Sequence, residues 1–381
     1  MPSTTGYAIR AGFAREATVT TVTWPAAAAA AVTQRLPVLD VDANDGATKA
    51  GTVTTDAWYA PTAFDLLNIT PTLRLPSQLR YQGLEQLWAC TLGFGARRFG
   101  STNNPETLAT GAYKHRYELD SVMGATPWML GEGWQLGDGL QLGQRRIRRG
   151  TVAVDLQSEV WEFLSAMVTG WTLSAGLAGC TLAVDFAAYS KSTSSSVNTA
   201  TTLANALPAT APRARFDEMV FRIAPYSSST ALNSGDALRV SSWALRVDHQ
   251  LTTAFGPLMG TAPEEYERTQ PPTVTLTFVL PQHEAATWQS RWTANSRVMA
   301  DAKWTGALIG ASGQQYQCNV YLPCLQVTNA QLNAAGSGLY PDTVQAVGVT
   351  PTAAAAGFPT MQWLGPLAVE LVSGVSTHGL L

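Results

Sequence analysis

The sequence predicts a mainly β protein with a few short helices. The clearest evidence is residues 273–280, where apolar and polar residues alternate with the two-residue period of a strand that has one buried and one wetted face. Its polar positions Thr273, Thr275 and Thr277 are expected to face away from the core. Charged residues make up only 13% of the chain, against roughly 25% in ordinary soluble domains. Charged side chains on a surface repel other copies of a protein, and here they are few. We therefore expect extensive contacts between copies of the chain.

The N-terminal region is expected to be an arm followed by a hairpin. Residues 1–60 carry short β-branched runs around a turn sequence of Asn, Asp and Gly at residues 44–46. Residues 64–75 have the composition of a strand that Pro71 and Pro76 interrupt.

The first helix is predicted at residues 83–93, where apolar residues recur at helical spacing. Gly93 lies where the end of a helix favours a residue that tolerates positive φ. Strand alternation follows at residues 113–119 and again at residues 152–156, with a Gly-rich hairpin expected between them at residues 131–143. Sheet therefore dominates this part of the chain.

Residues 158–168 fit two structures. Val160, Phe163 and Met167 have helical spacing, yet the segment continues into an alternating run that is typical of a strand. Residues 180–186 alternate as the return arm of a hairpin that turns near residues 176–179.

The chain is predicted to contain two tandem β modules. Residues 61–190 form the first module, and a Ser-, Thr- and Ala-rich stretch at residues 191–213 is a linker or a long loop. Residues 214–381 form the second module, in which the part after Gly336 is a candidate arm. Each half shows strands, one short helix and more strands, which is the basis of this division.

The second half contains strands at residues 219–223 and 243–247. Between Val240 and Trp243 the apolar positions change from even to odd numbers, which indicates a β-bulge. A helix is predicted at residues 284–295, with Ala285, Trp288 and Trp292 on its apolar face.

Nothing in the sequence indicates an enzyme. It contains no GxxxxGK[ST], HExxH or GxSxG motif. His115 and His249 occur in strand-like sequence, where structural roles are the ordinary expectation, and Cys318 and Cys324 lack the second nearby pair of a zinc site. We therefore expect no catalytic residue, no cofactor and no metal.

Composition also restricts the partners. The 24 basic and 27 acidic residues give no positive field for tight nucleic-acid binding. No window approaches the ~18 uncharged apolar residues of a membrane helix, and the alanine run at residues 26–31 lacks the flanks of a signal peptide. The scattered cysteines are expected to be buried thiols of a protein made in a reducing cytosol.

Five segments together resemble the major tail tube proteins of long-tailed bacteriophages, the siphovirus type with a non-contractile tail. They are the helix entry at residues 81–87 and the strands at residues 115–119, 168–173, 240–245 and 271–280. In that family a β-sandwich flanked by a helix sends long strands into a ring, and the inner sheet forms a barrel around a lumen through which DNA passes. The resemblance implies a structural virion protein, the major tail tube subunit, made in the host cytoplasm.

The resemblance also implies the partners. Copies of the chain would form stacked rings, either as a pseudo-hexameric trimer of two-module chains or as a hexamer. A tape measure protein and tail terminator or tip proteins would bind the tube, and DNA would pass without specific binding. The strand with Thr273, Thr275 and Thr277 is then a candidate for the lumen or wall of the tube.

Two charged clusters are candidate contacts between copies. They are the basic residues Arg145, Arg146, Arg148 and Arg149, and the acidic residues Glu264, Glu265 and Glu267. Guanidinium groups also bind phosphate, but a conduit that held DNA tightly would stall it. Acids that follow a proline usually form a solvated loop, so a catalytic role is not indicated.

Two other functions remain open. The chain has twelve tryptophans, and Trp58, Trp128 and Trp134 occur in loop-like sequence, as they would in a β-sandwich carbohydrate-binding or host-attachment protein of a virion. Trp243, Trp288 and Trp292 fall on apolar periodicities, so burial is expected for them. A polysaccharide hydrolase would require two carboxylates converging in a cleft.

If the basic run meets the acidic cluster of a neighbouring copy, reversing Arg148 and Arg149 to Glu is expected to block polymer growth, because opposite charges become like charges. Sedimentation of assembled material measures the effect, and unchanged assembly of the double variant would contradict the pairing.

Overall fold

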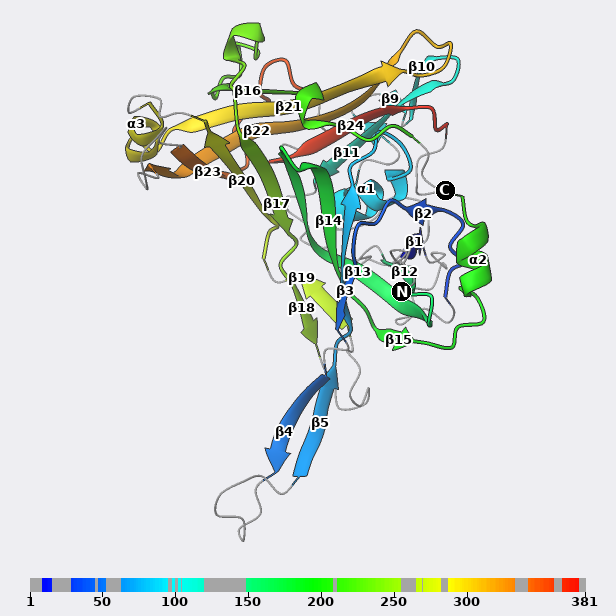
Figure 1. Cartoon of the computed structure of the whole chain (residues 1–381). Helices are drawn as coiled ribbons and strands as arrows, with labels where there is room; N and C mark the ends of the chain where they lie inside the picture. The colour runs from blue at the N-terminus through cyan, green and yellow to red at the C-terminus, as the bar shows by residue number, and fades with distance from the viewer. Residues whose placement is uncertain are drawn as a thin grey trace, which may run out of the picture.

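The fold was analysed on a computed structural model of the chain (Figure 1). The residues it describes are 9–15, 29–44, 47–52, 63–94, 98–99, 102–103, 105–119, 149–207, 211–254, 265–268, 270–281, 287–332, 342–359 and 365–376. Several predictions concern residues outside these ranges. They are the Gly-rich hairpin at residues 131–143, the tryptophans Trp58, Trp128 and Trp134, the arginines Arg145, Arg146 and Arg148, and Glu264.

The predicted mainly β fold is confirmed, since eighteen strands of the described residues join into one hydrogen-bonded sheet. Part of this sheet is a group of antiparallel strands that we call the first layer. In order of pairing they are β3 (Asp42–Asn44), β6 (Thr72–Gln78), β14 (Gly179–Ala187), β13 (Val160–Gly176), β17 (Ser242–Asp248), β20 (Thr273–Leu280) and β23 (Asp342–Gly348). In Figure 1 the long strands of this layer run down the molecule.

A second layer runs across the top of the molecule in Figure 1. Its strands, in order of pairing, are β16 (Met219–Pro225), β21 (Arg297–Leu308), β22 (Gln315–Leu332), β24 (Ala368–Ser373), β11 (Ala112–Leu119) and β10 (Glu106–Ala109), with β7 (Gly93–Phe94) also on β11. Beside the first part of β13 lie β12 (Arg149–Asp155), β1 (Arg10–Arg15), β2 (Arg35–Leu36) and β15 (Ser190–Ser192). A further pair is β8 (Arg98–Phe99) and β9 (Thr102–Asn103).

Two long strands connect these groups. The first part of β13 pairs with β12 and β15, and its last seven residues pair with β14 and β17. Similarly, β22 pairs with β24 near its start and with β23 near its end. The ambiguous residues 158–168 are therefore mostly strand, and the helical interpretation is wrong, because pairing on both edges of β13 outweighs the local helical spacing.

One hydrophobic core fills the space between the layers. Its centre is formed by indole rings that meet edge to face, with centroids 5.5 Å apart for Trp88 and Trp171 and 5.7 Å apart for Trp243 and Trp304. All four of these side chains are fully buried. Such pairs stabilise a core by about 0.5–1.5 kcal/mol beyond the burial of their area.

The helix predicted at residues 83–93 is confirmed as α1 (Glu85–Leu92), and Gly93 enters β7 directly. Its first residue is tied to its surroundings by hydrogen bonds. The backbone N–H of Gly83 donates to Glu85 Oε2 over 2.7 Å, and Ser373 Oγ donates to Glu85 Oε1 over 3.1 Å. Burial raises the pKa of the Glu85 carboxyl above its ordinary value.

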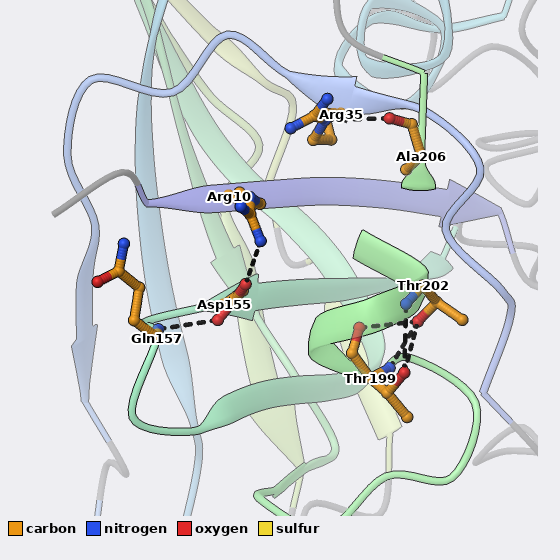
Figure 2. Close-up of polar contacts among 7 residues, drawn as sticks. All are labelled: Arg10, Arg35, Asp155, Gln157, Thr199, Thr202 and Ala206. Atoms are coloured by element: carbon orange, nitrogen blue, oxygen red, sulfur yellow. Dashed lines mark hydrogen bonds and ion pairs between the residues drawn. The ribbon is translucent and has the colours of Figure 1, made fainter. Parts of the chain in front are cut away.

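The predicted linker at residues 191–213 is ordered structure over most of its length. It contains α2 (Ala200–Asn205), whose start is capped reciprocally by Thr199 and Thr202 (Figure 2). Figure 2 also shows Arg35 donating to the Ala206 carbonyl over 3.0 Å, which joins this segment to the N-terminal region.

The N-terminal residues are part of the sheet. Ion pairing of Arg10 with Asp155 at 3.3 Å joins β1 to β12 (Figure 2). Further along, β4 (Ala47–Thr52) pairs with β5 (Ala63–Ile69), while β3 pairs with β6. The hairpin therefore does not turn at residues 44–46 as predicted, because residues 42–44 pair with residues 72–74 and residues 47–52 pair with residues 63–69.

Two local predictions around prolines and serines are wrong. Pro76 lies inside β6 rather than ending it. Its nitrogen, which bears no hydrogen, faces residues 37–39, and this segment pairs with β6 only through an isolated bridge at Val38. The strand therefore tolerates the proline. The predicted bulge at Ser241 and Ser242 is instead the start of β17 at Ser242, which follows a short 3₁₀ turn, η2 (Ser234–Asp236).

Among the described residues after Gly336, two strands belong to the sheet. They are β23, which pairs with β20 and β22, and β24, which pairs with β11 and β22. These strands are thus interior members of the sheet and do not form an arm. The division into two modules stays a prediction, although β13 of the first half pairs with β17 of the second.

The helix predicted at residues 284–295 is present as α3 (Thr287–Thr293). Trp288 is buried, and its ring lies 5.1 Å from that of Phe278. Trp292 is 41% exposed, so the prediction of burial is wrong for this residue. The two indoles lie one turn apart on the same face of α3, so it is the position of Trp292 near the end of the helix, not its face, that separates it from buried Trp288.

We expect Trp288→Ala to lower the free energy of unfolding by about 3–5 kcal/mol, because it leaves a cavity beside Phe278. The matched control Trp292→Ala, on the same helix, is expected to change it by about 0.5 kcal/mol or less. Urea unfolding followed by circular dichroism measures both variants. Equal losses would contradict the different burial of the two indoles.

Candidate functional site

The outward side of the first layer is the main candidate site, and we call it the polar face. The residues on it that bear polar or small side chains include Gln78, Thr181, Ala183, Thr172, Ser174, Ala244, Thr275, Thr277 and Gln345. Along β20, Val274, Leu276 and Phe278 are fully buried. Thr273 is exposed, whereas Thr275 and Thr277 are half-buried, which confirms the predicted alternation of this strand.

The middle of the polar face is a row of small and hydroxyl-bearing residues. Ser174 lies opposite Thr181 on one side and Ala244 on the other, and Ala244 lies opposite Thr277. The hydroxyls of Ser174 and Thr181 are 2.7 Å apart and hydrogen-bonded. Such a row offers hydrogen-bonding groups without strong local charge.

Charged residues gather at one end of the polar face. The strand register places Asp42 opposite Arg74 and Arg74 opposite Asp185. Gly170 lies opposite Asp185 on one side and opposite Asp248 on the other, so these residues form one row across the layer. Arg74 Nε lies 3.7 Å from Asp185 Oδ1. We call these residues, together with Arg246, the charged end.

The carboxyl of Asp185 is perturbed by its place in the charged end. Burial raises its pKa above the ordinary value, Arg74 and Arg246 oppose this rise, and Asp248 and Asp42 add to it. Alternation predicted that these positions face away from the core, but only strand register could reveal that they lie side by side.

Two hairpins extend beyond the charged end, as Figure 1 shows. One is β4–β5, and the other is formed by β18 (Leu251–Ala254) and β19 (Glu265–Arg268). Glu265 and Glu267 lie in β19, paired with Ala254 and Thr252, so the prediction of a solvated acidic loop is wrong for these two residues. Backbone pairing with β18 orders the segment despite its charge.

Of the predicted basic cluster, only Arg149 lies in the described residues, at the start of β12. It pairs with Met167, and Met167 packs with Ala187 and Leu251. Arg149 therefore enters the sheet near the base of the β18–β19 hairpin, in which Glu265 and Glu267 lie.

The opposite end of the first layer holds an open pocket of about 410 Å³. The turn that joins β13 to β14 forms one wall, and this turn requires glycine at Gly179, which has a φ of +118°. Leu177 at its tip is 96% exposed, and Leu39, which also lines the pocket, is 50% exposed. The remaining lining includes Phe216 and the charged residues Arg213, Arg215 and Asp217. No pattern in the sequence predicts this pocket, because residues far apart in the chain form it.

The rim of the pocket is partly fixed by ion pairing. Arg215 bonds to Asp217, which raises the pKa of the arginine and lowers that of the aspartate. Nearby, Tyr81 donates its hydroxyl to Glu218 Oε2 over 2.7 Å. Arg213 is exposed and forms no ion pair with any residue that the structure describes.

His115, His249 and the four cysteines lie in the interior. Buried His115 places Nε2 2.9 Å from the Val375 carbonyl, and His249 is buried as well. All four cysteines are buried thiols, as predicted, and form no disulfide, and burial raises the pKa of Cys180 to about 11. Among the described residues no group of three or more His, Cys, Asp or Glu side chains could hold a metal ion.

Comparison with known proteins gives little further information. No protein-family model matches the chain. No curated protein matches it either. Among solved structures, the chain is similar to a crystal structure of Hcp protein, at 13% identity over 36% of this chain and 96% of that one. The TM-score of 0.21 is too low for this likeness to carry an argument.

Within the described residues, no helix has the length and apolar character needed to cross a membrane.

We expect Asp185→Asn to flatten the pH dependence of stability. Because the pKa of Asp185 is raised in the folded chain, the folded chain binds this proton more tightly, and stability falls as the pH rises from the ordinary value of 3.8. Asparagine does not titrate, so the variant lacks this fall. Urea unfolding at a series of pH values measures it.

Asp217→Asn is the control with the opposite sign. Its pKa is lowered by Arg215, so it stabilises the fold at higher pH, and that stabilisation is lost as the pH falls. A profile for Asp185→Asn that matches the unaltered chain would contradict the assignment.

Proposed function

We propose that the chain is a structural subunit that assembles into a hollow tube, and specifically the major tail tube protein of a long-tailed bacteriophage. The observation that carries the proposal is the polar face: a broad antiparallel surface whose middle bears hydroxyl and small side chains. The segments that resemble tail tube proteins lie in or beside this sheet, namely α1, β11, β13, β17 and β20.

The chemistry of the polar face suits the wall of a DNA conduit. Tight binding to DNA depends on several Lys or Arg side chains that neutralise phosphates. In the middle row, Ser174, Ala244 and Thr277 offer none, and Arg246 is one row away. A wall that bears hydroxyl groups and few cationic side chains would keep the lumen hydrated and would not bind the passing DNA duplex tightly.

Assembly would also cover unpaired strand edges. In the described structure β3 pairs only with β6, and β16 pairs only with β21 apart from a bridge at Arg222. Exposed edges of this kind invite pairing with other chains, and closure of a ring removes them. Low overall charge acts in the same direction, because it weakens repulsion between copies.

The finer features of the proposal follow from the resemblance. Copies would form rings, as a trimer of two-module chains or as a hexamer, and the rings would stack. Tape measure, terminator and tip proteins would bind along or at the ends of the tube, and the assembled protein would reside in the virion tail.

Negative-stain electron microscopy of the purified chain across a concentration series tests this function. We expect hollow filaments with a regular axial repeat above a threshold concentration, and rotational averages of end-on views would separate three copies per ring from six. Purification buffer and urea-unfolded protein serve as controls. Discrete monomers at every concentration would contradict the proposal.

A further inference from the structure

We propose that the pocket between the β13–β14 turn and residues 213–217 binds a small phosphate monoester that carries an apolar or aromatic group. The guanidinium groups of Arg80 and Arg213 would hold the phosphate, and the apolar lining of the pocket would hold the rest of the ligand. Such a site goes beyond the proposed structural role, and it does not depend on assembly of the chain into a tube.

Two arginines lie directly opposite each other beside the pocket. Residues 79–81 pair with residues 212–214 through an antiparallel bridge between Arg80 and Arg213, and backbone hydrogen bonds of 2.8 and 3.2 Å lie on either side of this bridge. The two arginines are therefore a non-hydrogen-bonded pair, in which side chains come closest, with Cβ atoms about 4.5–5.5 Å apart. Like charges at such positions repel and destabilise the pairing.

The nearby carboxylates do not neutralise this pair. Asp217 accepts a hydrogen bond from Arg215 Nε over 2.8 Å, and Glu218 Oε1 lies 3.8 Å from the same nitrogen, so both acids are engaged by one arginine. Neither Arg80 nor Arg213 forms an ion pair with any residue in the described ranges. The rim of the pocket therefore keeps an excess of positive charge, which an anion would balance.

The Arg80 guanidinium is held in place beside the pocket. Its Nη1 donates to the Ala211 carbonyl over 2.6 Å, and its Nη2 donates to Oε1 of Gln78, a lining residue, over 3.3 Å. Its Nε is buried, and no acceptor for it occurs in the described part of the chain. A cation fixed in this way loses little freedom when a ligand binds, which favours affinity.

A phosphate monoester matches two guanidinium groups in charge and in geometry. It carries about −1.5 to −2 charges at pH 7 and presents three acceptor oxygens, so it can pair with Arg80 and Arg213 together. Guanidinium groups bind such oxygens through two parallel N–H bonds. A carboxylate carries one charge and would leave one of the two arginines without a counter-charge.

The rest of the lining selects the body of the ligand. The pocket of about 410 Å³ falls in the range of about 300–1,000 Å³ that small-molecule sites occupy. Its lining includes Phe216, Leu39 and Leu177, and both leucines are at least half exposed. A ring on the ligand would cover these apolar side chains and pack on the phenyl group of Phe216. An aromatic phosphate ester is therefore expected to bind more tightly than inorganic phosphate.

Titration of the full chain with phenyl phosphate, followed by ligand-observed NMR, tests the site. We expect a dissociation constant on the order of 1 mM, as is usual for a ligand of this size. Inorganic phosphate lacks the ring and benzoate lacks the second charge, so each is expected to bind about tenfold more weakly. Equal binding of benzyl alcohol, which has the ring and no charge, would contradict the role of the arginines.

Substitution of the two arginines separates a binding role from a structural one. Arg80→Gln and Arg213→Gln are each expected to weaken phenyl phosphate binding about tenfold or more. Without ligand, Arg213→Gln should raise the midpoint of thermal unfolding by about 1 °C, because it removes the repulsion; a structural arginine would lower it. The matched control is Arg246→Gln, at an exposed arginine of the charged end, which is expected to leave the affinity unchanged.

Competition with DNA distinguishes a pocket from a charged surface. A short duplex without terminal phosphates is expected not to displace phenyl phosphate, because each of its diester phosphates carries one charge and lies on a backbone too wide for the pocket. Displacement by the duplex, unchanged binding in Arg213→Gln, or an equal loss in Arg246→Gln would each overturn the site. Filament formation is a separate measurement, so its failure would contradict the tube and leave the pocket as it is.

Discussion

The structure depends on two strands that each belong to two groups of the sheet. The 17 residues of β13 and the 18 residues of β22 pair with different neighbours along their length, so the sheet turns without ending. The turn in β13 coincides with a register shift at Val168 and Gly170, where a Cβ atom would lie 2.9 Å from the Val247 carbonyl oxygen. Glycine is therefore required at Gly170, where the backbone of β17 approaches β13 closely.

This constraint explains which elements the sequence could predict. Strands with regular alternation, such as β17 and β20, bury every second side chain against the indole core, so their pattern reflects their packing directly. The helix α1 could be predicted equally well, because its apolar residues recur at helical spacing and are buried in that same core. In β13 the pattern was ambiguous, since its first part is covered on both faces and loses the two-residue period.

Other features could not be predicted because they arise from pairing between distant segments. Pro76 is tolerated in β6 only because its neighbouring segment makes an isolated bridge there, and no local signal reveals that. Trp292 has the spacing of a core residue, but it lies next to the last residue of α3 and is 41% exposed, which its spacing does not reveal. The charged end and the pocket likewise depend on strand register, which alternation does not fix.

The distribution of charge links the fold to its proposed assembly. Alternation confines polar residues to the polar face, and register then places the aspartates and arginines of the charged end together while leaving hydroxyls in the middle. Ion pairs near a surface are weak in water, so such clusters contribute little to folding itself. Their concentration at the ends of the strands instead provides directional attraction where copies would meet, and the neutral middle avoids attraction where a polyanion would pass. In the proposed tube, the position of the charges rather than their 13% share of the chain would therefore decide both the attraction between copies and the weak attraction for DNA.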